Sequence, residues 1–264
     1  MKLGFIGCGN MATAMMKGII SNGIVPREEI IGADVSESCL DRVKTELGIL
    51  VTTDNKEAAK SAEVLILSVK PQFYESVIEE IKDIVTKEQL IVTIAPGKTL
   101  EWLEQQFGRM VKIVRTMPNT PALVGEGITG ACRNENVTDE ELEHVVSILC
   151  GFGKCEIISE SLMDVVVSVS GSSPAYVFMF IEAMADAAVA DGMPRTQAYE
   201  FAAQAVLGSA KMVLETGKHP GELKDMVCSP GGTTIEAVRV LEEKGMRSAI
   251  FEAMKACTKK AKGL

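Results

Sequence analysis

The stretch GFIGCGNMATAMMKG, residues 4–18, carries four glycines between an apolar run and a helical pattern. The run before the turn, residues 2–7, has the composition of a strand, and the residues after it have apolar positions at helical spacing. Between them, the hexapeptide GCGNMA at residues 7–12 matches the pattern G-x-G-x-x-A. The first glycine permits a tight turn, and the small last residue lets helix and strand pack closely. The stretch therefore predicts a strand that turns sharply into a helix.

Strand-like runs and helical patterns alternate from here to about residue 155. Two of the runs, residues 63–69 and 89–95, are almost wholly apolar, as strands buried on both faces are. Such alternation predicts an α/β fold, a doubly wound parallel sheet with helices on both faces. The five predicted strands are residues 2–7, 28–33, 63–69, 89–95 and 111–116.

After about residue 158 the sequence predicts helices alone. We therefore expect two domains, an α/β domain at residues 1–160 and an all-helical domain at residues 161–264. The predicted helices are residues 172–192, 193–217, 221–227, 233–245 and 246–263.

The first of these helices, which follows Pro174, is apolar nearly all round. A small domain with few other elements could hardly bury such a helix alone, so we expect it to pack against another subunit. The alternative is a helix fully internal to one monomer.

Composition excludes several classes of partner. The net charge of −9 at pH 7 argues against general binding to nucleic acids or anionic membranes, because basic patches hold both. Local positive groups could still bind a small anion. The most apolar stretch, residues 165–190, contains Gly171 and Pro174 and carries Glu182 and Asp186, so no membrane span is expected.

The seven cysteines are odd in number and scattered through apolar segments, which is typical of reduced, intracellular thiols. Cys150 and Cys155 form the one close pair, but no second pair accompanies them and His144 lies in a separate helical pattern, so no metal site is expected. The N-terminal segment lacks the pattern of a secretory signal, and a cytoplasmic location is expected.

The turn at residues 7–12 is typical of dinucleotide binding. Gly9 would let a diphosphate approach the backbone, and the following helix would offer free N–H groups and a partial positive charge. The alternative is a plain turn between a strand and a helix. The further strand-helix units favour the dinucleotide.

Two charged residues stand where parallel strands end, at the edge where open α/β sheets bind ligands. Asp34 follows the second predicted strand, where a carboxylate accepts from ribose hydroxyls and repels a 2′-phosphate, which favours NAD over NADP. Alternatively, Asp34 merely begins a loop. Lys70 could offset phosphate or carboxylate charge, or be an ordinary solvated lysine, and Arg115 ends another strand at the same edge.

A second constellation, CSPGGTT at residues 228–234, lies between two helical patterns. Two glycines and two threonines that open a helix can form an anion nest able to hold a carboxylate. The alternative is an ordinary helix cap by serine or threonine.

No apparatus for nucleophilic catalysis is evident. Neither His144 nor His219 stands beside a serine or cysteine in a recognisable pattern, and both are expected on the surface or in loops. Chemistry that needs little acid–base machinery is favoured, such as hydride transfer from a cofactor.

The chain resembles the Δ1-pyrroline-5-carboxylate reductases over nearly its whole length. The most specific block is HPGELKDMVCSPGGTTIEAVRVLE, because the glycine-rich turn alone would fit many reductases. The other blocks are FIGCGNMATAMMKG, SVKPQ, VRTMPNTPALVGEG and SGSSPAYVFMFIEAMADAAV.

This resemblance implies an N-terminal Rossmann domain and a helical domain that interlocks with a partner's to make a homodimer, with dimers often assembling into rings. Members of the family reduce the C=N bond of pyrroline-5-carboxylate to L-proline with NADPH or NADH. The substrate carboxylate would lie on residues 229–234, in a site formed between subunits.

By the same resemblance, the catalytic residues would be Thr234, which contacts the ring nitrogen, and Lys70. The cofactor would be bound by Ile6, Gly7, Gly9, Asn10, Met11, Asp34, Asn55, Ser68, Val69 and Lys70. The substrate would be bound by Ser229, Gly231, Gly232, Thr233 and Thr234.

The sequence departs from the family at two places. Ser173 replaces a glycine that many relatives carry, and the loop ADVSES at residues 33–38 has Asp34 in place of a basic or hydroxyl-rich run for a 2′-phosphate. We therefore expect use of both cofactors, with NADH relatively strong. The alternatives are another imine or β-hydroxyacid reductase, for which Lys211 and Lys224 lack the surrounding motif, and a non-catalytic NAD-binding protein.

Overall fold

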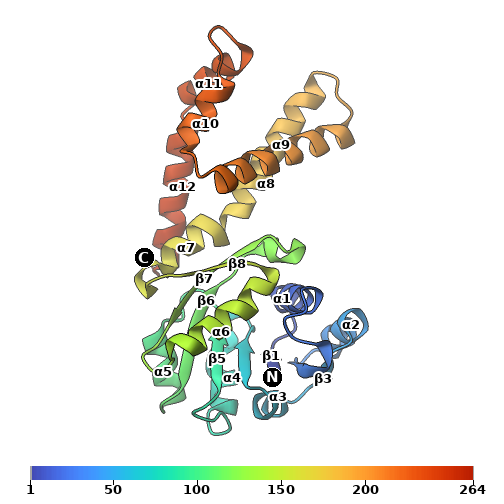
Figure 1. Cartoon of the computed structure of the whole chain (residues 1–264), viewed down its shortest axis with the longest axis vertical. Coiled ribbons are helices and arrows are strands. Elements are labelled where there is room, and N and C mark those ends of the chain that lie inside the picture. The colour runs from blue at the N-terminus through green and yellow to red at the C-terminus, as the bar shows by residue number, and fades with distance from the viewer. Residues whose placement is uncertain (1, 264) are drawn as a thin grey trace. The chain divides into compact units, whose positions relative to one another are not determined.

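The computed structural model describes residues 2–263, which divide into two compact units (Figure 1). One unit contains the residues up to Ser172 and those from Cys257 onward, and the other is Ser173–Ala256. The predicted division of function at residue 160 stays a prediction.

The first unit is built on an eight-stranded sheet in the order β3-β2-β1-β4-β5-β6-β7-β8. Its neighbouring strands run parallel except β6 and β7. The strands are β1 Leu3–Ile6, β2 Ile30–Ala33, β3 Leu50–Thr52, β4 Val64–Leu67, β5 Leu90–Thr93, β6 Lys112–Met117, β7 Gly127–Arg133 and β8 Gly153–Ile157.

The five predicted strands are confirmed, but the sequence prediction missed β3, β7 and β8. β3 is only three residues long with a largely exposed Leu50, and glycines interrupt the apolar pattern of β7. The prediction of a parallel sheet was wrong for β6 and β7. Their connection holds only the short helix η3, Thr120–Val124, and a parallel crossover needs a longer one.

Helices cover both faces of this sheet, as predicted. Buried residues of α1 Asn10–Ser21, α2 Glu37–Leu47 and α6 Asp139–Leu149 form one core with Leu3 and Phe5 of β1. Those of α3 Asn55–Ser61, α4 Tyr74–Ile81 and α5 Leu100–Phe107 form the other core with Ile6. Successive strand residues point to opposite faces, so each strand contributes to both cores.

The order of the sheet places the glycine-rich turn at a point where strand connections diverge. β1 lies between β2 and β4, so the chain leaves β1 toward one side and later returns to the other. Ligands of open α/β sheets bind beyond the carboxyl ends of the strands at such a switch point. The turn at residues 7–12 stands there.

Shorter helical segments complete the first unit. The π-helical turn Val167–Gly171 continues α7, Met163–Val166, toward the next helix, and the Thr258 hydroxyl donates to the Ser168 hydroxyl at 2.9 Å. The remaining segments are η1 Arg27–Glu29, η2 Pro71–Phe73, η4 Cys150–Phe152 and η5 Glu160–Leu162.

The second unit is helical, and all five predicted helices are confirmed. The helix α8 packs along α9, and the last residues of α12 belong to the first unit. The helices are α8 Ser173–Ala190, α9 Arg195–Thr216, α10 Pro220–Val227, α11 Thr233–Glu243 and α12 Met246–Ala261.

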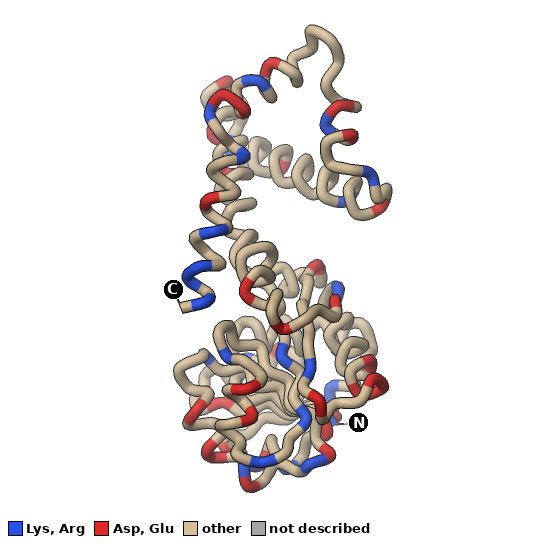
Figure 2. The backbone as a smooth tube through the Cα atoms, turned by 90° about the vertical axis from the view of Figure 1, so that its left-hand side faces the viewer, with Lys and Arg blue, Asp and Glu red and all other residues tan. Residues whose placement is uncertain are grey.

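The helix α8 is not internal to the described chain, which excludes the alternative of a core helix. Its only buried residue is Ala185, while Phe178 is 62 % exposed. The sequence of α8 carries only two charged residues, Glu182 and Asp186, and much of the tube of the second unit in Figure 2 is tan. Because Gly171 and Pro174 do not break the helical run, residues 160–190 are long and apolar enough to cross a membrane by length and composition alone. A large apolar surface of this kind needs a partner.

Candidate functional site

The turn after β1 accepts only glycine at its first position. Gly7 has φ +99°, and a Cβ there would lie 2.8–2.9 Å from backbone atoms of Ser68 and Val69. The Ser68 hydroxyl donates to the Gly7 carbonyl at 2.7 Å, which ties the turn to the end of β4. Ile6, Gly7, Ser68 and Val69, four of the predicted cofactor residues, are therefore adjacent.

Gly9 has a different role. A Cβ built on it would meet no atom within 4 Å, so the backbone at Gly9 faces open space. Gly9 is the N-cap residue of α1, and because it has no side chain, no cap hydrogen bond occupies the first N–H groups of the helix. The first turn of α1 also holds no acidic residue. The N–H groups of Asn10 and Met11 thus open a helix that fits the diphosphate of a dinucleotide.

Cys8 is held from two directions. Its N–H donates to Asp34 Oδ2 at 2.7 Å, and its carbonyl accepts from Arg42 Nη2 at 3.1 Å. Asp34 Oδ1 also accepts from the Ser36 N–H at 2.9 Å, so both carboxylate oxygens are anchored. Burial, with the neighbouring Asp34 charge as the next cause, raises the pKa of the Cys8 thiol to about 12, which keeps it protonated.

A pocket of about 280 Å³ lies beside this loop. It brings together four residues expected from the sequence, Gly7, Asp34, Asn55 and Val69. Asn55, which is 9 % exposed, donates from Nδ2 to Glu80 Oε2 at 2.8 Å. The sequence prediction missed the other lining residues, which are Val35, Phe73, Ser76, Val77 and Glu80.

A signal for most of the missed residues was present in the sequence. Phe73, Ser76, Val77 and Glu80 are spaced as i, i+3, i+4 and i+7, so they share one helical face. That face follows directly on the Lys70-Pro71 turn at the ligand edge. Spacing alone could not show that this face meets a pocket.

The two basic residues predicted at this edge, Lys70 and Arg115, differ in their exposure to solvent. Lys70 is exposed where β4 gives way to η2. Arg115 is 4 % exposed, and its Nη1 donates to Glu160 Oε1 at 2.7 Å. Arg115 therefore ties β6 to η5 and offers no free charge to a ligand.

The second constellation forms an open helix start. Gly231 has φ +68°, and Gly232 is the N-cap residue of α11 with no side-chain hydrogen bond. The alternative of a serine or threonine cap is therefore wrong. Ser229 accepts the Gly232 N–H through its carbonyl at 3.0 Å, and the first N–H groups of the helix, at Thr233 and Thr234, are oriented for an anion.

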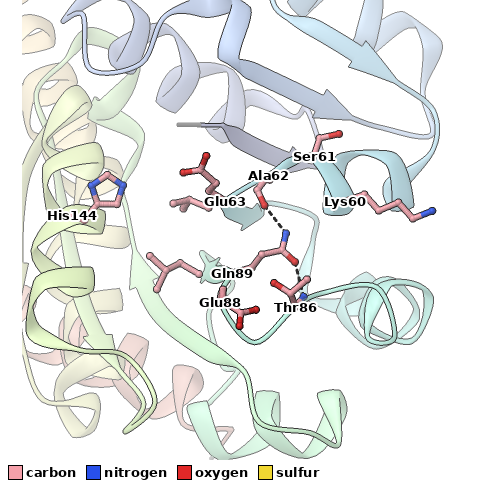
Figure 3. A pocket seen from close by; sticks show the side chains of 10 residues that line it. Lys60, Ser61, Ala62, Glu63, Thr86, Glu88, Gln89 and His144 are labelled. Carbon is pink, nitrogen blue, oxygen red and sulfur yellow. Dashed lines mark hydrogen bonds between the residues drawn. The ribbon is translucent and has the colours of Figure 1, made fainter.

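The pocket of about 420 Å³ in Figure 3 lies elsewhere, beside the first residues of β4 and β5. Its central polar side chain, Gln89, accepts from the Thr86 N–H and donates to the carbonyls of Ala59 and Ala62. These bonds close a loop against α3. The pocket is at the amino ends of the strands, opposite to the edge that binds ligands in such sheets, and we assign Gln89 a structural role.

Comparisons with known proteins agree with these features. The family model for pyrroline-5-carboxylate reductase dimerisation matches residues 160–264, and a model described as NADP oxidoreductase, coenzyme F420-dependent, matches residues 2–97. The chain is 54 % identical over 263 residues to the pyrroline-5-carboxylate reductase of Escherichia coli (strain K12), covering 100 % of this chain and 98 % of that protein.

Two solved structures are similar over nearly the whole chain. The pyrroline-5-carboxylate reductase of Coxiella burnetii superposes with a TM-score of 0.92 at 38 % identity, over 99 % of this chain and 97 % of that one. The pyrroline carboxylate reductase of Plasmodium falciparum, with NADP bound, gives 0.90 at 33 % identity over the same shares. With a Rossmann sheet, an open glycine-rich turn and a dimerisation segment, this chain belongs to the pyrroline-5-carboxylate reductase family.

Proposed function

We propose that this chain reduces the C=N bond of 1-pyrroline-5-carboxylate to give L-proline, the last step of proline biosynthesis. The chain is an NAD(P)H-dependent oxidoreductase acting on a CH–NH group. The observation that carries the imine substrate is the open helix start at α11, which lies in the most specific family block. The turn after β1, in which Gly7 admits no side chain and Gly9 leaves the start of α1 open, accounts for the dinucleotide. When bound, NAD(P)H supplies the hydride.

The residues of the first unit bind and orient that cofactor in our proposal. Gly9, Asn10 and Met11 hold the diphosphate through N–H groups, and Asp34 and Asn55 contact the adenosine ribose. Lys70, beyond the end of β4, offsets negative charge along the cofactor. Ile6, Gly7, Ser68 and Val69 shape the turn on which it lies.

The helix start at α11 binds the substrate in our proposal. The free N–H groups of Thr233 and Thr234 hold the substrate carboxylate beside Ser229, Gly231 and Gly232, and the Thr234 hydroxyl orients the ring nitrogen. The protonated imine is itself the electrophile, so the reaction needs alignment more than a strong base. Such orientation can lower a barrier by roughly 7–11 kcal/mol in favourable cases.

We expect Thr234→Ala to lower kcat/KM for the imine roughly 10- to 100-fold, because the hydroxyl that aligns the ring nitrogen is lost. Thr234→Ser keeps a hydroxyl and should retain most of the activity. Steady-state kinetics on proteins shown to be folded and dimeric would test this. Full kcat/KM in the alanine variant would remove Thr234 from the mechanism.

Asp34 should bias the enzyme toward NADH, although both cofactors are used. Its carboxylate accepts hydrogen bonds from ribose hydroxyls and repels a 2′-phosphate. We expect Asp34→Asn to raise the ratio of kcat/KM for NADPH to that for NADH about tenfold, because it removes the charge but retains an acceptor. Asparagine still lets one oxygen accept from the loop. A wild-type preference for NADPH of about a hundredfold would contradict this role of Asp34.

The assembly and the location are also proposals. The dimerisation segment at residues 160–264 supports an oligomer. We propose a homodimer and a ring made of such dimers. The exposed apolar surface of α8 is then covered by the partner subunit rather than by a membrane. We propose a nucleotide domain at residues 1–160, a dimerisation and substrate domain at residues 161–264, a cytoplasmic location and no nucleic-acid partner.

Initial rates of NADH and NADPH oxidation with DL-pyrroline-5-carboxylate, against a blank without imine, test the proposal directly. Imine-dependent oxidation is the expected result. Folded protein that binds the nucleotide without turnover would point to another imine, a β-hydroxyacid substrate or a binding role.

A further inference from the structure

Glu80 is a carboxylate of the nucleotide pocket to which the mechanism so far gives no role. It lies near the end of α4, on the same helical face as Phe73 and Val77, and lines the pocket with Gly7 and Asp34. Its Oε2 accepts from Nδ2 of Asn55 at 2.8 Å. This bond joins α4 to the first residue of α3 across the wall of the pocket.

The bond decides which end of the Asn55 amide faces a ligand. An ionised carboxylate can only accept hydrogen bonds, so Glu80 takes the NH₂ group of Asn55. The amide is planar, and its nitrogen and oxygen leave the carbon in different directions. Holding Nδ2 at Glu80 therefore leaves the carbonyl oxygen as the acceptor that Asn55 can offer to a ligand.

Asp34 brings a second acceptor to the same pocket. Its two oxygens are anchored by the N–H groups of Cys8 and Ser36, so the carboxylate is held in place. The hydroxyl of Ser76 donates to the carbonyl of Phe73 and is engaged there. The polar side chains of the pocket thus offer acceptors to a ligand, which is complementary to the hydroxyl donors of a ribose.

We propose that Glu80 is a positioning residue of the nucleotide site, which fixes the Asn55 amide so that its carbonyl oxygen accepts from a ribose hydroxyl beside Asp34. This inference rests on the proposed function. Glu80 does not touch the reacting atoms and acts through Asn55.

The test is direct binding of NADH, followed by its fluorescence, and of ADP-ribose, followed by calorimetry. We expect Glu80→Ala to raise both dissociation constants about tenfold, the scale of one charge-assisted hydrogen bond. Glu80→Gln retains a carbonyl acceptor for Nδ2 and should stay within about threefold of wild type. Glu79→Ala is the matched control, because Glu79 is the neighbouring carboxylate, is 69 % exposed and pairs with Lys82 outside the pocket.

A double-mutant cycle separates action through Asn55 from an independent effect. If Glu80 acts by holding Asn55, the double variant Asn55→Ala with Glu80→Ala binds no more weakly than Asn55→Ala alone. If the double variant instead weakened binding by the product of the two single effects, the proposal would be overturned. The kcat with saturating NADH should change little, whereas KM for NADH should follow the dissociation constant.

Failure of this inference is distinguishable from failure of the proposed function. Wild-type protein that binds neither NADH nor ADP-ribose would remove the proposed function, and the role of Glu80 with it. Wild-type protein that binds both, with Glu80→Ala equal to Glu79→Ala, would overturn the Glu80 assignment alone. Glu80 is exposed in the described chain, so we expect its variants to keep the wild-type Tm.

Discussion

Gly7→Ala should weaken NADH binding on the order of 100-fold and also lower the Tm. A positive φ costs a residue with a side chain about 1–3 kcal/mol. In addition, the new Cβ would lie 2.8–2.9 Å from backbone atoms of Ser68 and Val69, which cannot swing aside as the end of a long side chain can. The turn must open, and the N–H groups at the start of α1 then lose their alignment on the diphosphate.

Two other glycines serve as controls for this variant. Gly23 has φ +65° and nothing within 4 Å of a Cβ, so Gly23→Ala measures the backbone strain without the clash. Gly9 has ordinary φ and open space, so Gly9→Ala should keep the Tm while weakening NADH binding, because its methyl group stands where the diphosphate approaches. Calorimetry and NADH fluorescence supply both readouts. A Gly7→Ala protein with wild-type Tm and affinity would contradict the assigned role of the turn.

Glu160→Ala should destabilise the protein by about 3 kcal/mol, the scale for leaving the buried partner of an ion pair without its counter-charge. Glu160 Oε1 accepts from Arg115 Nη1 and from the Leu100 N–H, both at 2.7 Å. The side chain of Arg115 is only 5 % exposed, so the variant leaves a guanidinium buried without its carboxylate. The first N–H of α5 loses its acceptor at the same time.

Thermal denaturation followed by circular dichroism measures this effect. A loss of this size corresponds to a fall in Tm of ~6–12 °C for a chain of this length. Glu79→Ala removes an exposed ion pair with Lys82 and should leave the Tm unchanged. Equal Tm values for the two variants would show that the Arg115–Glu160 pair does not stabilise the first unit.

The sequence predicted those strands and helices whose residues carry a clear apolar or helical pattern of their own. Buried parallel strands read as apolar runs, and β4 and β5 lie within the two almost wholly apolar runs of the sequence. The strand β7 escaped prediction because glycines interrupt its apolar pattern, so its own residues gave no sign of the pairing with the preceding β6. The length of the connection decided that this pairing is antiparallel.

In the nucleotide site, too, some features follow from the sequence and others from the packing of the elements. The sequence by itself determined the turn at residues 7–12, because only glycine adopts the φ of Gly7 without strain, and it placed Asp34 at the end of β2. Tertiary structure alone decided that Arg115 is buried against Glu160 whereas Lys70 is exposed. The sequence suggested that both residues end strands, but only Lys70 follows its strand, and Arg115 lies within β6. Tertiary structure also brought Glu80 to Asn55, 25 residues apart. The physical reason is that backbone conformation and strand burial are read from neighbours in the chain, whereas the partner of a charged or amide side chain is set by which elements pack together.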